Sequence, residues 1–439
     1  MVAQMTHVEH KGNHQMNKYI FMLTIAIIIS ACGGSESEPD KVIIEPVLEQ
    51  PVDLFIANME GLPLDEFIQQ SFPQLLLRDP ELVLYEGLSK EVSLDTYQLT
   101  DISREYREET NDFYNAALSL LKSYELGGLT TLQRQNYEVY LWWLEDQLQL
   151  KSYPQFQLNI LQSLSLSDFF LGLHPLQSEQ DALNYIAQLE GLAGQYEALR
   201  THLVDRQSKG IIDPVVLVGH VVEQLNGLVN LAPTEAPIYQ HFAQVSAALN
   251  MSAERRTALI EQVASIIEDE VKPELTELVS ALESMLPHAP TYEIGLNQYP
   301  LGSEYYQAIL SHHLTASMTA EQMYQAGLEE LTSVQETMRA EFDLLGYPSH
   351  YTLEQFYQLL EESAPMVEKE QVVSTFESLL SDVNTKIEGA FHAMSVPSLS
   401  VVASHQDGYY PASKDGTESG RFVADTRNNR PYYLMPSLA

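Results

Sequence analysis

Residues 254–286 read ERRTALIEQVASIIEDEVKPELTELVSALESML, and their pattern recurs along most of the chain. Apolar residues follow one another there at steps of three and four, the spacing that places them on one face of an α-helix. The opposite face is rich in glutamate, which is typical of a solvated surface. The stretch predicts a long amphipathic helix. Pro273 should bend or split it, because proline lacks the N–H that a helix interior needs.

The same spacing extends outward from this stretch in both directions. Two helix starts carry the spacing of a capping box, Thr319 with Gln322 and Thr352 with Gln355. The pattern predicts helices at about 97–124, 130–149, 178–206, 213–230, 236–249, 252–286, 303–313, 319–345, 352–362 and 367–393. We therefore predict a mainly α fold, with a helical N-terminal region over residues 53–290.

The composition disfavours several function classes. The 439 residues include 61 Asp and Glu against 23 Lys and Arg, a formal charge of −38. Affinity for nucleic acids depends on cationic side chains that neutralise phosphates, so we expect no nucleic-acid partner. A single cysteine excludes an internal disulfide framework and any site built on several cysteines.

The N-terminal sequence has the form of a targeting signal. A short apolar run, residues 19–31, follows Lys18 and resembles the core of a signal peptide. It ends in Ile29-Ser-Ala-Cys32, which looks like a bacterial lipobox with Cys32 as the lipidated residue. We expect a leader and signal peptide over residues 1–31 and a lipidated tether over 32–52. The expected location is the cell envelope, with the lipid holding the protein on the outer membrane facing the periplasm.

The helical pattern gives way to strand-like stretches near the C-terminus. Residues 398–403 and 421–426 read as strands, and they predict a small β element there.

The residues on their own offer no complete catalytic constellation. The chain lacks a dinucleotide fingerprint, a phosphate loop, a nucleophile elbow and an HExxH zinc motif. His220 and Glu223 have ligand-like spacing but read as a surface or polar-core pair. His312 and His313 are adjacent, so at most one of them points into any site.

Several stretches together resemble one family. Asp79-Pro-Glu81, Ala182–Leu189, Gly210-Ile-Ile-Asp-Pro214 and Gly302-Ser-Glu-Tyr-Tyr306 occur in the order and spacing of the bacterial domain of unknown function 885. The block that begins at Gly302 and runs on to Gly327-Leu328 is the most specific. The resemblance extends from about residue 53 to residue 439.

The resemblance implies a zincin-like metallopeptidase architecture. Family members carry an HExxPGHH-like motif on a helix, and here residues 421–425 and 432–439 match the segment that precedes it. The zinc-binding histidines and the general-base glutamate have no counterpart, so no catalytic or metal residue is assigned. Zinc is expected for complete members and not for this chain. The strand formed by Phe422, Val423, Ala424 and Asp425 is expected to be an edge that pairs with extended peptide substrate.

We therefore expect residues 291–439 to be the first part of a metallopeptidase-like region that stops before its metal motif. The leading hypothesis is a truncated or inactive metallopeptidase-like lipoprotein with an incomplete zincin-like helical architecture. Two alternatives stay open: a non-enzymatic periplasmic binding lipoprotein, and one half of a split peptidase. The residues leave the oligomeric state and the substrate open.

Overall fold

The structure is a computed structural model that describes residues 51–85, 88, 92, 98–174, 176–292, 295–314, 316–363, 372–390, 400–402, 421–425 and 430–434. The predicted leader and signal peptide (1–31) lie outside these residues, and so does the predicted tether (32–52) except for its last two residues, Pro51 and Val52. The chain divides into two units, Met1–Ser152 and Tyr153–Ala439. The further division predicted at residue 290 stays a prediction.

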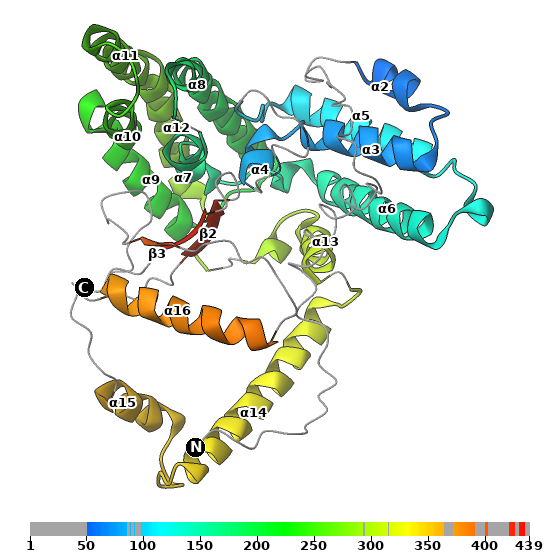
Figure 1. The fold of residues 1–439 in the computed structure, drawn as a ribbon, viewed down its shortest axis with the longest axis vertical. Helices are drawn as coiled ribbons and strands as arrows, with labels where there is room; N and C mark the ends of the chain where they lie inside the picture. The colour runs from blue at the N-terminus through cyan, green and yellow to red at the C-terminus, as the bar shows by residue number, and fades with distance from the viewer. Residues whose placement is uncertain are drawn as a thin grey trace. The chain divides into compact units, whose positions relative to one another are not determined.

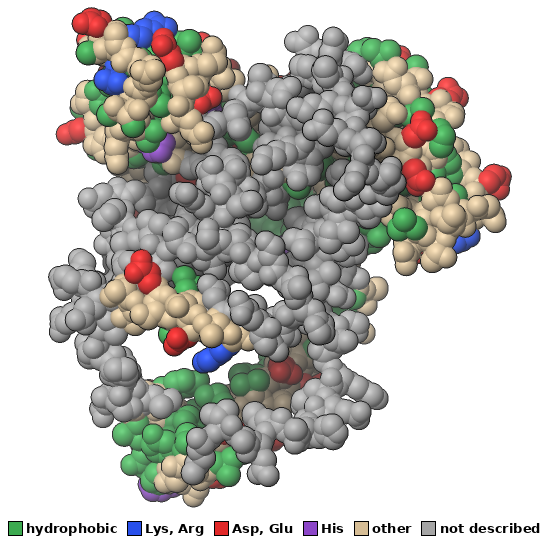
Figure 2. All heavy atoms as spheres, viewed as in Figure 1, with side chains coloured by type: hydrophobic (Ala, Val, Ile, Leu, Met, Phe, Trp, Pro, Cys, Tyr) green, Lys and Arg blue, Asp and Glu red, His purple; other side chains and the backbone are tan. Residues whose placement is uncertain are grey.

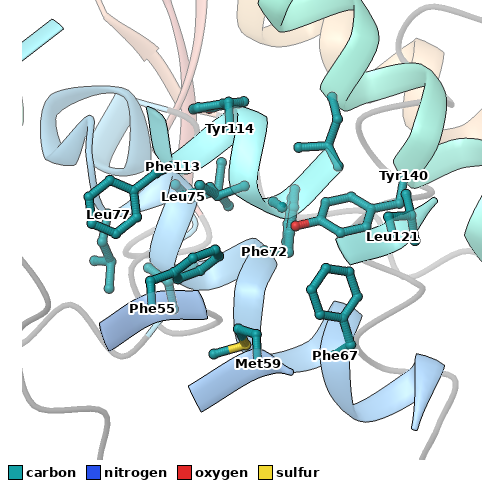
Figure 3. Close-up of a cluster of buried hydrophobic side chains, with 14 of the residues drawn as sticks. Phe55, Met59, Phe67, Phe72, Leu75, Leu77, Phe113, Tyr114, Leu121 and Tyr140 are labelled. Carbon is teal, nitrogen blue, oxygen red and sulfur yellow. The ribbon is translucent and has the colours of Figure 1, made fainter. Parts of the chain in front are cut away.

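The first unit is built from helices around one apolar core. They are α2 (Val52–Met59), α3 (Leu64–Leu76), α4 (Pro80–Tyr85), α5 (Arg104–Leu121) and α6 (Thr131–Lys151). Helix α5 packs against α2, α3 and α6. Figure 3 shows the core between them, where Phe55 meets Phe113 edge to face with ring centroids 5.3 Å apart. The buried Tyr140 hydroxyl lies 2.8 Å from the Ser71 hydroxyl, so both polar groups are satisfied inside the core.

The second unit contains a helical bundle. Its helices are α7 (Gln162–Ser165), α8 (Glu179–Ser208), α9 (Val215–Val229), α10 (Pro237–Ser246), α11 (Ala253–Ile266) and α12 (Lys272–Met285). Helix α12 packs against both α8 and α9, and α11 packs against α8 (Figure 1). The apolar positions of the stretch quoted first are buried here, including Val263, Leu278 and Leu282. The stretch therefore forms much of the core of this bundle, as its spacing predicts.

Pro273 splits that long helix. A single turn of π-helix, η6 (Ile267–Val271), separates α11 from α12, and Pro273 lies in the first turn of α12. The Lys272 amide donates to the Ile267 carbonyl, five residues back. The wider turn accommodates a residue that cannot donate a backbone hydrogen bond.

Four more helices follow: α13 (Gly302–Leu314), α14 (Ala320–Leu344), α15 (Leu353–Ser363) and α16 (Val372–Ala390). Both predicted capping boxes are confirmed. The Thr319 hydroxyl accepts from the Gln322 amide at 3.2 Å, and the Thr352 hydroxyl accepts from the Gln355 amide at 3.2 Å. The Gln side chains accept in return from the Thr amides. Reciprocal bonds of this kind fix where α14 and α15 begin.

Helices α14 and α15 pack against each other. The Phe342 ring stacks on Phe356 with centroids 3.8 Å apart and planes 8° apart. The Tyr357 hydroxyl lies 3.8 Å from the Met338 sulfur. Figure 2 shows further hydrophobic side chains gathered over α15 and the adjoining end of α14.

Three strands are described: β1 (Ser400–Val402), β2 (Arg421–Asp425) and β3 (Arg430–Leu434). They form a sheet of order β1-β3-β2, with β3 parallel to β1 and antiparallel to β2. In its register Phe422 lies opposite Tyr433 and Ala424 opposite Pro431.

The predicted mainly α fold is confirmed. Each predicted helix has a counterpart among α5, α6 and α8 to α16, and most of its ends lie within a few residues of the predicted ones. The start predicted at 97 is too early, because the Ser103 side chain caps α5 by accepting from the Tyr106 amide. Helices α2, α3, α4 and α7 were not predicted. No helix in the described ranges is long and apolar enough to cross a membrane.

Candidate functional site

The strongest candidate site surrounds the start of α13, and we call it the α13 seat. Its buried residues are Phe156, Ile211 and Tyr299, with Tyr153, Leu296 and Tyr305 packed against them. The Tyr305 ring stacks on Phe156 with centroids 4.7 Å apart and planes 10° apart. The Tyr305 hydroxyl also donates to the Phe156 carbonyl at 3.2 Å. One side chain therefore fixes α13 through both its ring and its hydroxyl.

The turn between α8 and α9 forms the other side of the seat. The Tyr299 hydroxyl donates to the Ile212 carbonyl, and the Val215 amide donates to the Pro290 carbonyl at 2.9 Å. Two of the family-like stretches, 210–214 and 302–306, are thus brought to one place although they are about 90 residues apart in the chain.

A buried ion pair holds this turn. Arg206 at the end of α8 reaches Asp213 through two hydrogen bonds, at 3.0 and 3.3 Å. The Arg206 side chain is 4% exposed and the Asp213 side chain 18%. A bidentate pair of this kind fixes geometry, since the planar guanidinium matches the two carboxylate oxygens.

The phenols of the seat are held neutral. Burial raises the pKa of Tyr299, with Asp213 adding to the rise and Arg206 opposing it. Burial also raises the pKa of Tyr305, again opposed by Arg206. Both hydroxyls donate to backbone carbonyls, so they act here as hydrogen-bond donors that position α13 rather than as bases.

Gly302 explains why the seat needs glycine at the first position of α13. A Cβ built on Gly302 would lie 1.7 Å from the Leu296 carbonyl oxygen. The preceding Leu301 has φ 61°, a left-handed conformation that L-residues rarely adopt. The close approach of the two backbone segments therefore excludes any side chain at Gly302.

The histidines singled out in the sequence do not come together. His220 and Glu223 are both exposed on α9, and the His220 Nε2 lies 3.0 Å from the Gln224 Nε2. His312 is half-buried and His313 exposed, with ring centroids 5.1 Å apart. Within the described ranges no group of three or more His, Cys, Asp or Glu could hold a metal ion.

A second polar cluster lies in the first unit around Arg78, which sequence reasoning missed. Its side chain is 3% exposed, pairs with Glu109 at 2.8 Å and lies over the Tyr106 ring, 3.9 Å from the centroid. Burial raises the pKa of Tyr106 to about 12, an effect that Arg78 opposes. The only signal in the sequence is an arginine directly after the apolar run Leu75-Leu-Leu77.

The adjoining family-like stretch at Asp79 is a helix cap. The Asp79 carboxylate accepts from the Leu82 amide at 3.1 Å and from the Thr100 hydroxyl at 2.6 Å. Both contacts stabilise the start of α4 and fasten it to the segment before α5. The expected edge strand, Phe422–Asp425, is β2, which lies at one end of the strand order. Cys32 lies outside the described residues.

Comparison with known proteins places the chain in a family. The sequence model of the family "Bacterial protein of unknown function (DUF885)" matches residues 80–439. No curated protein matches the chain. One similar solved structure is "the putative lipoprotein from Colwellia psychrerythraea", with a TM-score of 0.70 and 17% identity over 85% of this chain and 68% of that one.

A second similar structure is "a putative lipoprotein of unknown function from Shewanella oneidensis". Its TM-score is 0.52 and its identity 19%, over 86% of this chain and 65% of that one. The chain therefore spans about two thirds of each solved relative. At these identities the likeness shows the fold alone.

Proposed function

Since the chain belongs to the bacterial family DUF885, we propose that it is the scaffold part of a lipid-anchored envelope protein with a zincin-like metallopeptidase architecture. In this proposal the zinc-binding helix belongs to sequence beyond residue 439. The α13 seat and the bundle of α8, α9 and α12 hold the frame on which that helix would be placed.

One observation carries the proposal. The family match runs to residue 439, yet the chain spans only 68% and 65% of two solved relatives. A substantial part of each relative thus has no counterpart here. The resemblance of residues 421–425 and 432–439 to the segment that precedes the family's metal motif supports a metallopeptidase-like frame in this chain.

No catalytic step is assigned to this chain. A zincin uses its metal to polarise the scissile carbonyl and to activate water, and it needs a set of His and carboxylate ligands for that purpose. The residues that the structure places do not offer such a set. The proposed contribution of the chain is therefore positioning, through the buried pair of Arg206 and Asp213 and the two tyrosines of the seat.

The strand β2 is the proposed peptide-binding edge. The strand order β1-β3-β2 supports this, because β2 has a neighbour on one side only within that sheet. Extended peptides add to such edges through backbone hydrogen bonds. In a protein that includes the sequence after residue 439, Ala424→Pro should weaken peptide binding. Unchanged affinity would remove β2 from the proposal.

The lipid anchor is proposed at Cys32, on the outer membrane facing the periplasm. The lipobox-like sequence before Cys32 supports it, and so do the lipoprotein names of the two solved relatives. Cys32→Ser should abolish incorporation of radiolabelled palmitate into the protein. Incorporation that persists in the variant would contradict an anchor at Cys32.

The experiment that tests the proposed function begins with the DNA downstream of codon 439. We expect an HExxPGHH-like sequence there in one of three frames. A protein that joins this segment to the chain should hydrolyse a casein-derived peptide mixture, whereas the 439-residue chain should not. A clean stop codon with no such sequence, together with a stably folded chain, would favour the non-enzymatic binding lipoprotein instead. A separately encoded segment that restores hydrolysis when added would favour the split peptidase.

A further inference from the structure

We draw no further inference here: the strongest candidate, the buried side-chain cluster around Arg78 in the turn between α3 and α4, leaves the Nη1 atom of Arg78 without a hydrogen-bond partner, but nothing in the part of the chain that the structure describes shows a cavity through which a ligand could reach that atom.

Discussion

Helices α8 and α14 begin alike and end up in different surroundings. Both are long, with 30 and 25 residues, and both start at a capping box. Yet α8 buries eleven residues along its length, whereas α14 buries one. The comparison teaches that an amphipathic pattern reports the presence of an apolar face and does not report what covers it. Four experiments test how strongly each region depends on its buried contacts.

The largest effect is expected where α8 ends, at the buried pair of Arg206 and Asp213. Asp213→Ala leaves a buried guanidinium without its carboxylate, which should cost about 3–5 kcal/mol of unfolding free energy. The matched control is Asp205→Ala, which breaks the exposed pair of Asp205 with Lys209 at the same end of α8. That loss should stay within about 1 kcal/mol. Urea denaturation followed by circular dichroism measures both, and equal losses would contradict the seat.

A direct comparison of the two helices comes next. Leu199→Ala in α8 removes a fully buried side chain and should cost about 2–5 kcal/mol. Leu331→Ala in α14 removes a half-exposed one and should change the unfolding free energy by no more than about 0.5 kcal/mol. A large loss at Leu331 in the 439-residue chain would show that this side chain is already packed.

Glycine-to-alanine changes should have opposite signs in the two regions. Gly302→Ala forces a Cβ against the Leu296 carbonyl, so we expect a loss of about 1–3 kcal/mol. Gly327→Ala in α14 meets nothing within 4 Å, so it should stabilise that helix by about 0.5–1 kcal/mol through helix propensity. The thermal midpoints should therefore move in opposite directions, and a gain at Gly302 would contradict the close approach that the seat requires.

The smallest effect is expected from pH. The pKa of Tyr305 is raised above the ordinary 10.0. The folded state therefore favours the protonated phenol. Stability is full below about pH 10 and is lost as pH rises through the folded-state pKa, because the unfolded chain deprotonates first. Tyr305→Phe should flatten this alkaline loss when denaturation midpoints are compared at about pH 8 and about pH 11. A slope unchanged by the substitution would mean that Tyr305 is not buried.

Local signals in the sequence predicted most of the helices, because caps and spacing act within a few residues. Thr319 and Thr352 marked their helix starts, and Pro273 marked the break between α11 and α12. The first unit was harder to predict. Helix α3 contains Pro73 inside it, a residue that argues against a helix on propensity alone.

The α13 seat could not be predicted in the same way. Its contacts join residues far apart in the chain, such as Tyr299 with Ile212 and Tyr305 with Phe156, and no local pattern encodes such a pairing. Arg78 was missed for the same reason, since its partners Tyr106 and Glu109 lie in α5, far from Arg78 in the chain. The resemblance to the family singled out residues 210–214 and 302–306, and the structure shows that both stretches contribute contacts to the α13 seat.

The central proposal is that this chain provides the frame of a metallopeptidase-like protein and does not itself hold the zinc ion. Elemental analysis of zinc tests it most directly, on the 439-residue chain and on the protein extended by the downstream segment, each purified with zinc present and then dialysed. We predict one zinc ion per extended protein and none retained by the 439-residue chain. One zinc ion per 439-residue chain would contradict the proposal if substitutions of surface histidines, such as His220→Gln, leave that zinc bound.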